Sequence, residues 1–166
     1  MMEQRLSIIT LGVADLARAR RFYTEGLGWR ASAQSQKTIV FIPLNGFVLS
    51  LYERSALVED AFGKEAAQKH RAAAENAAAE SAAAKSAAAD SAAPNFTLAH
   101  NVRTVEEVAQ TLQFAQKAGA KLIKKAQKVF WGGTSGYFAD LDGFLWEVAH
   151  NPHAPLAANG DLRMDV

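Results

Sequence analysis

Glu147 is the side chain whose chemistry most needs an explanation. It lies in the run FLWEVA (residues 144–149), whose β-branched and aromatic residues predict a strand. Because side chains alternate along a strand, Leu145, Glu147 and Ala149 share one face. A carboxylate in such an apolar setting is costly unless it is paired or protonated. Glu147 is therefore a general base, a polar anchor for a ligand, or half of a structural ion pair with an arginine such as Arg103.

Three further polar residues are candidates for the site, and two of them, Asn101 and His100, could assist Glu147 as a base, as could Tyr137. Asn101 lies near the end of another predicted strand, where its amide could orient a ligand carbonyl group or serve only the structure. His100 precedes it and therefore points to the opposite face, toward a helix layer, as a catalyst or as a core histidine. Tyr52 ends a third predicted strand with a polar tip that a ligand could meet.

An aromatic run forms the other candidate group. It comprises Phe130, Trp131, Gly132 and Gly133, followed by Tyr137 and Phe138. The glycines allow close turns, and the aromatic side chains either wall a pocket or pack in the core. We expect a ligand to meet Tyr52, Asn101, Trp131, Tyr137 and Glu147.

The elements that must position these residues occur twice in the chain. The first copy begins with the strand LSIITLGV (residues 6–13), and a helix follows that Asp15 caps. Gly26 and Gly28 end this helix, and Asn45-Gly46 predicts a tight hairpin turn. Three further strands are predicted in this copy, at residues 29–34, 38–44 and 47–52.

The second copy repeats this plan. Thr104 and Glu107 form a T-x-x-E capping box at the start of a helix that follows a strand and ends near Gly119. Strands are predicted at residues 96–102, 122–130, 134–139 and 144–149. The hairpin segments NGFVLSL (45–51) and DGFLWEV (142–148) align residue for residue, so the βαβββ plan is an internal duplication.

Between the copies lies a segment of low complexity, at residues 60–94. Residues 72–91 repeat a five-residue unit that is rich in alanine, the best helix former, and Pro94 stops the helix. A five-residue step spirals around a helix axis, so the repeat creates no wide apolar stripe. We expect an exposed helical spacer, with a partner-binding arm as the alternative.

Composition bounds the function. The chain has 166 residues, of which 49% are hydrophobic, enough for one sizeable core. Eighteen basic residues balance 17 acidic ones, so no net charge draws the protein to nucleic acid or membranes. The absence of cysteine excludes disulfides and thiolate chemistry and agrees with a reducing cytoplasm. No apolar run reaches the roughly 20 residues of a membrane span, and no signal sequence is apparent.

With this duplicated plan, the sequence resembles the vicinal oxygen chelate superfamily, the glyoxalase/bleomycin resistance group. The segment LGVADLARARRFYTEGLGW (11–29) is similar to the family's first strand and helix, and FADLDGFLWEVAHNP (138–152) to its closing hairpin. The resemblance implies an α+β fold in which two βαβββ modules, with curved mixed sheets, form a cup. Members of the group include isomerases, dioxygenases, thiol transferases and non-enzymatic drug-binding proteins, so the fold alone does not fix the function.

The resemblance also implies where a metal would sit. The family's ligands come from the first and last strands of each module, positions that correspond here to Ile8, Ser50, Thr97 and Glu147. Isoleucine has no donor atom and hydroxyls are poor ligands, whereas catalytic zinc normally needs three protein ligands. We therefore expect no metal in the cup and no cofactor, and Glu147 could then also be a remnant of metal binding.

The sequence leads to two functional hypotheses. The first is a single-domain, metal-free cup that binds a small, partly apolar molecule, as bleomycin-binding relatives do. The second is a metal-independent lyase or isomerase that uses Glu147 as general base, and whether a reaction occurs stays open. We expect a cytoplasmic homodimer that binds neither nucleic acid nor membranes. Its single domain (1–166) divides into modules at 1–59 and 95–150, the insert at 60–94 and a tail at 151–166.

Overall fold

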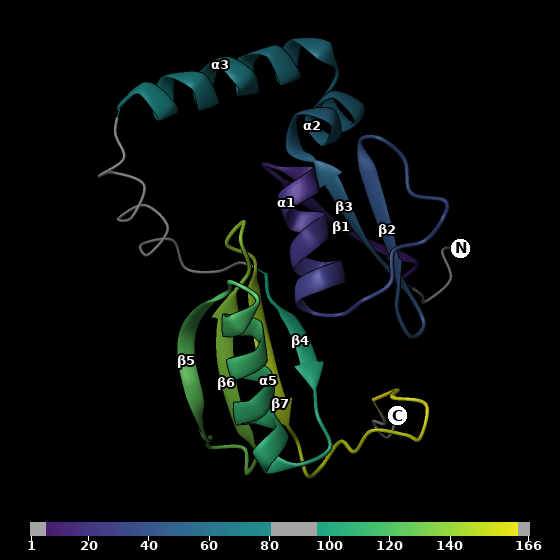
Figure 1. Cartoon of the computed structure of the whole chain (residues 1–166), viewed down its shortest axis with the longest axis vertical. Helices are drawn as coiled ribbons and strands as arrows, with labels where there is room; N and C mark the ends of the chain where they lie inside the picture. The colour runs from purple at the N-terminus through teal and green to yellow at the C-terminus, as the bar shows by residue number, and fades with distance from the viewer. Residues whose placement is uncertain (1–5, 81–95, 163–166) are drawn as a thin grey trace.

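The computed structural model describes residues 6–80 and 96–162 (Figure 1). Its first module contains β1 (Ile8–Val13), α1 (Leu16–Arg21), a π-helical extension η1 (Phe22–Gly26), β2 (Ile39–Pro43) and β3 (Val48–Glu53). The strands form one sheet in the order β1-β3-β2, in which β1 runs parallel and β2 antiparallel to β3. The predicted cap is confirmed, because the Asp15 carboxylate accepts a hydrogen bond from the Arg18 backbone N–H at 2.9 Å.

The strand predicted at residues 29–34 is wrong. This segment runs as irregular chain beside β2. The Ser32 backbone N–H donates a hydrogen bond to the Phe41 carbonyl oxygen of β2 at 2.7 Å. The Ser35 hydroxyl then accepts a hydrogen bond from Phe41 N–H. Serine side chains that bond to nearby backbone compete with a regular strand ladder, so the first sheet has three strands in the described residues.

The second module contains β4 (Leu98–Asn101), α5 (Val105–Lys117), β5 (Lys121–Lys128), β6 (Thr134–Ala139) and β7 (Leu145–His150). Its sheet has the order β4-β7-β6-β5, with β4 parallel to β7, so it repeats the first sheet with one strand added. Thr104 and Glu107 form the predicted capping box. The α+β fold with a duplicated module is therefore confirmed.

Each helix covers one face of its sheet. In the second module α5 buries Val108, Leu112 and Ala115 against β5, β6 and β7. A Cβ at Gly136 of β6 would lie 2.5 Å from Leu112, which shows how closely the helix approaches that strand. We call the opposite face of each sheet, away from α1 or α5, the cup face.

The two modules share one hydrophobic core, and a buried polar contact joins them. The Tyr23 hydroxyl of η1 donates to the Asp140 carboxylate at 2.6 Å and accepts from Trp146 Nε1 at 3.2 Å. A Cβ at Gly26 would lie 2.8 Å from the Ala118 Cβ of the second module, so only glycine permits this approach. The modules are thus held in one arrangement, one above the other in Figure 1.

Two helices follow the first module directly. They are α2 (Arg54–Phe62) and α3 (Lys64–Glu80), separated by Gly63. Leu57 and Arg54 of α2 lie over Gly12 of β1, so α2 covers part of the first sheet's cup face, while α3 projects beyond the body of the molecule (Figure 1). The helix predicted for the insert agrees with α3, and residues 81–94 of the insert lie outside the described part. Within the described ranges no helix is long and apolar enough to cross a membrane.

Candidate functional site

A row of polar side chains crosses the cup face of the second sheet. Tyr137 of β6 pairs with Lys124 of β5 on one side and with Glu147 of β7 on the other. The Lys124 ammonium lies 5.5 Å from the centre of the Tyr137 ring. Desolvation raises the pKa of Tyr137, and hydrogen bonding to the Glu147 carboxylate and its negative charge add to that shift. Glu147 is half-buried, so the row is open to a ligand.

The ion pair considered for Glu147 and Arg103 is not formed. Arg103 instead donates to the carbonyl oxygens of Leu156, Ala157 and Ala158, at 3.2, 2.8 and 3.3 Å. Among the described residues, the salt bridges of arginine involve Arg18 and Arg71 and not Glu147. Glu147 is therefore not paired with any arginine of residues 6–80 and 96–162.

The four positions that correspond to metal ligands do not make a ligand set. Ile8 has no donor, and the fully buried Ser50 hydroxyl donates to the Thr10 hydroxyl at 3.2 Å. The Thr97 hydroxyl donates to the Leu145 carbonyl oxygen at 3.0 Å. Only Glu147 offers a charged donor, and in residues 6–80 and 96–162 no three His, Asp or Glu side chains cluster as a metal site would require. These residues do not fit the family's metal.

A groove of about 700 Å³ lies between the modules. Its walls come from the β2–β3 hairpin, from the edge strand β4 and from the tail, which we define as residues 151–162. The apolar wall residues include Leu44, Phe47, Leu49, Leu98, Leu156 and Leu162. Among the described residues, the polar side chains that line the groove are Asn45, His100, Asn101 and Asp161.

The tail closes one side of this groove because it is tied to both modules. The Asn45 side-chain amide of the first module donates to the Asn159 carbonyl oxygen. Arg103 of the second module binds the carbonyl groups of residues 156–158. A short bridge between Leu156 and Leu162 folds the tail back on itself. The groove therefore depends on three separate parts of the chain.

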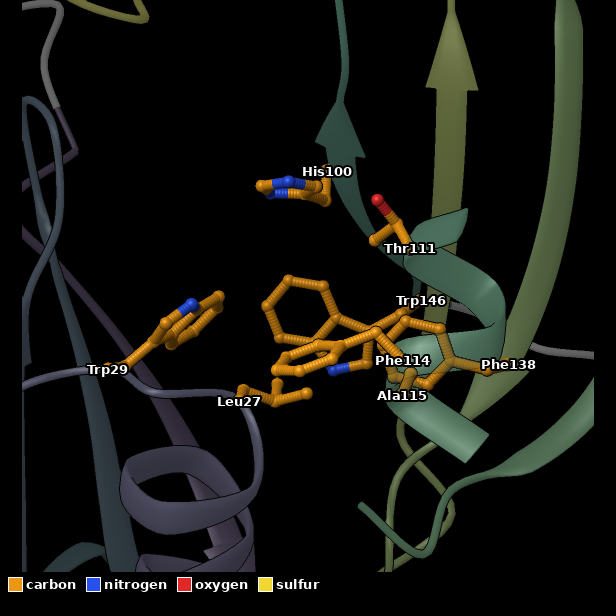
Figure 2. Close-up of a pocket in the computed structure, with 8 residues that line it drawn as sticks. All are labelled: Leu27, Trp29, His100, Thr111, Phe114, Ala115, Phe138 and Trp146. Carbon is orange, nitrogen blue, oxygen red and sulfur yellow. The ribbon is translucent and has the colours of Figure 1, made fainter. Parts of the chain in front are cut away.

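A smaller pocket of about 200 Å³ adjoins the groove on the helix side of the second sheet (Figure 2). Leu27 and Trp29 line it from the first module, and His100, Thr111, Phe114, Ala115, Phe138 and Trp146 line it from the second. Three of these residues, Trp29, His100 and Trp146, also line the groove. The pocket and the groove therefore share a wall.

His100 is the titratable group at this shared wall. Desolvation lowers its pKa, and the negative charge of Glu107 acts in the opposite direction, although part of the ring stays open to solvent. The imidazole is thus neutral near pH 7 and can donate or accept one hydrogen bond. Its ring points into the space between the two modules in Figure 2.

The structure brings some of the predicted site residues together and not others. Asn101 lines the groove and pairs with Ala149, so it shares the cup face with Glu147 and Tyr137, although these two residues line neither hollow. Tyr52 lies on β3 in the other sheet, and Trp131 packs over Gly133 in the turn before β6. The five residues do not form one site.

Sequence reasoning missed Trp29, Trp146 and the tail. Trp146 is buried on the helix side of its sheet, and its place in a pocket wall depends on Trp29 from the other module. The two indole rings lie 5.7 Å apart with an interplanar angle of 71°. In the sequence, only the aromatic character of Trp29 and Trp146 indicates that they could line a pocket.

Comparison with known proteins gives one family and several structures. A sequence model described as the glyoxalase/bleomycin resistance protein/dioxygenase superfamily matches residues 5–148. A glyoxalase-related enzyme from Fulvimarina pelagi has 32% sequence identity and a TM-score of 0.75, over 99% of this chain and 100% of that one. A search of curated proteins gives no match.

More distant structures share the fold alone. A fosfomycin resistance protein from Listeria monocytogenes has 20% identity and a TM-score of 0.57, with 90% of this chain and 95% of that one covered. A lactoylglutathione lyase from Agrobacterium tumefaciens has 14% identity and a TM-score of 0.58, with the same coverage, 90% and 95%.

Proposed function

This chain belongs to the glyoxalase/bleomycin resistance protein/dioxygenase superfamily, and we propose that it binds a small, partly apolar molecule without a metal. The observation that carries this proposal is the groove between the modules, with its leucine-rich wall and its amide, imidazole and carboxylate groups. Ligand sites of this kind bury most of a small molecule in apolar contacts and orient it with a small number of polar groups.

The donor chemistry supports binding without a metal. The superfamily's metal positions are held here by Ile8, Ser50 and Thr97 together with Glu147, and the two hydroxyls are engaged in hydrogen bonds. Three of four positions thus offer no strong ligand. Binding must then come from the protein's own apolar and hydrogen-bonding groups.

A groove-filling variant tests the proposal. The probe is Nile red, a neutral dye that is too large for the smaller pocket and fluoresces when it leaves water. Ala99 lines the groove and is exposed, so Ala99→Trp should fill the groove without disturbing the core. Ala61→Trp, on the exposed side of α2, is the matched control.

We expect saturable binding of Nile red by the wild type in the presence of EDTA, with an affinity that Ala99→Trp lowers at least tenfold. The Ala61→Trp variant should bind as the wild type does. Equal affinities in both variants would contradict a site in the groove, as would a strict need for an added divalent metal.

A metal-independent lyase or isomerase is the second candidate, and the polar row on the cup face favours it. Glu147 pairs with no arginine in the described part of the chain and lies next to Tyr137, with Lys124 beyond, so a carboxylate base and two proton-bearing groups lie on one open face. Trp146 and Glu147 point to opposite faces of β7, so a reaction at Glu147 would occur away from the pocket in Figure 2.

Conversion of a bound compound separates the two candidates. Compounds that copurify with the wild type and with Glu147→Gln are identified by mass spectrometry before and after incubation with fresh protein. The enzyme predicts that the wild type converts a compound that Glu147→Gln retains, while Glu106→Gln, on the exposed face of α5, behaves as the wild type. Recovery of the same unchanged compound from all three proteins would eliminate Glu147 as a base.

A homodimer and a cytoplasmic location stay proposals. Each module leaves sheet edges that a second copy could cover, as in other two-sheet proteins. Sedimentation of the full chain at high micromolar concentration tests the dimer, and a strict monomer would count against it.

A further inference from the structure

The pocket in Figure 2 differs from the groove in the kind of side chain that forms it. Four of its eight lining residues are aromatic, namely Trp29, Phe114, Phe138 and Trp146. They come from four separate segments: the chain after η1, the helix α5 and the strands β6 and β7. The other polar side chains of the lining are the His100 imidazole and the Thr111 hydroxyl, and none of the described lining residues carries a carboxylate, ammonium or guanidinium group.

The aromatic walls are ordered relative to one another. The rings of Phe138 and Trp146 are stacked, with an interplanar angle of 3° and a centroid distance of 6.1 Å. Trp29 meets Trp146 edge to face. A flat ring can continue either arrangement, because aromatic pairs favour offset stacks and edge-to-face contacts at centroid distances of roughly 4.5–7 Å.

We propose that this pocket takes an uncharged, flat aromatic group of one or two fused rings, and that this group is the buried end of the ligand. The inference rests on the proposed function, because the rest of the molecule then lies in the groove. The shared residues Trp29, His100 and Trp146 make the two spaces neighbours, so one molecule can occupy both.

The size and polarity of the pocket limit the ring. A cavity of roughly 150 Å³ in another protein accepts benzene, so about 200 Å³ suits one ring or two fused rings. Burying a charge without a partner is costly, which excludes an ionised group on the ring. A single hydroxyl or ring N–H can be satisfied by His100 or Thr111, which lie on the side of the pocket away from Leu27 in Figure 2.

A pair of matched probes tests the preference for a flat ring. 2-Naphthol and decahydro-2-naphthol carry the same hydroxyl group on two fused rings, but only 2-naphthol is flat and aromatic. Calorimetric titration of the wild type should give an affinity for 2-naphthol at least tenfold higher than that for the saturated alcohol. Equal affinities, or no saturable binding of 2-naphthol, would overturn the proposal.

Two variants of α5 test the location. Thr111→Phe places a ring in the pocket, and Gln113→Phe places the same ring on the exposed side of the helix. We expect Thr111→Phe to lower the affinity for 2-naphthol at least tenfold and Gln113→Phe to leave it unchanged. Thr111→Leu replaces Thr111→Phe if melting curves show that the latter does not fold. Unchanged binding by a folded variant at position 111 would overturn the location.

The two probes keep this inference separate from the proposed function. Loss of 2-naphthol binding in Thr111→Phe with retained Nile red binding supports both sites. Nile red binding without any 2-naphthol binding overturns the aromatic pocket and leaves the groove. Binding of 2-naphthol without Nile red binding overturns the groove, and with it the placement of the remainder of the ligand.

Discussion

Replacing Tyr23 by phenylalanine should loosen the contact between the modules. The Tyr23 hydroxyl is buried, donates to the Asp140 carboxylate at 2.6 Å and accepts from Trp146 Nε1 at 3.2 Å. A hydrogen bond to a charged group contributes about 1.5–3 kcal/mol, and leaving a buried donor without its acceptor costs about 1–3 kcal/mol. Asp140 still accepts hydrogen bonds from the backbone N–H groups of Asp142 and Phe144 in the variant. We therefore expect the free energy of unfolding to fall by about 2–4 kcal/mol.

The loss should depend on pH. Burial raises the pKa of Asp140, whereas the hydrogen bond from Tyr23 lowers it, so Tyr23→Phe raises this pKa further. A carboxyl group whose pKa is higher in the folded than in the unfolded state stabilises the fold at low pH, and this stability is lost as pH rises through the folded pKa. Tyr23→Phe should therefore lower the free energy of unfolding more at about pH 7.5 than at about pH 4.

Urea unfolding at both pH values measures this effect, and Tyr52→Phe is the control. Tyr52 is half-buried on β3, and its hydroxyl makes no hydrogen bond to another described residue, so its loss should cost about 0.5 kcal/mol or less. A loss under about 1 kcal/mol for Tyr23→Phe, or an equal loss at both pH values, would refute the role given to this contact.

Three further predictions concern the module contact, the insert and the metal. Gly26→Ala should lower the free energy of unfolding by about 1–3 kcal/mol, because the new Cβ would lie 2.8 Å from the Ala118 Cβ. A urea unfolding curve that matches that of the wild type would contradict this. Replacing residues 72–93 by a short Gly/Ser link should shift the melting temperature by only about 2 °C, since Ala67, a buried residue of α3, is retained. Elemental analysis after dialysis should find no stoichiometric Zn²⁺, Ni²⁺, Mn²⁺ or Fe²⁺, and a metal that the wild type retains but Glu147→Ala loses would show that the donor argument is wrong.

Local signals in the sequence predicted most of the fold. Signals of this kind depend on a few adjacent residues. The structure contains the Asp15 cap, the Thr104–Glu107 capping box, and the turns at Asn45-Gly46 and Asp142-Gly143. The strand at residues 29–34 failed because its serines bond to neighbouring backbone, a competition that strand propensity does not contain.

The candidate site was harder to predict because it is assembled from distant segments. Strand alternation placed Leu145, Glu147 and Ala149 on one face, which agrees with the structure, since alternation is a local property. The groove, in contrast, requires the tail to bind Asn45 and Arg103, which are separated from it by 114 residues and about 54 residues of chain. No pattern in the residues near Leu156 predicts these contacts.

The most direct test of the account is a crystal structure of the full chain with Nile red, prepared with EDTA. The account predicts dye density in the groove, against Leu44, Leu98 and Leu156, with no metal peak beside Glu147. Dye density on the cup face against Glu147 and Tyr137, or a metal ion bound there, would contradict a metal-independent site between the modules.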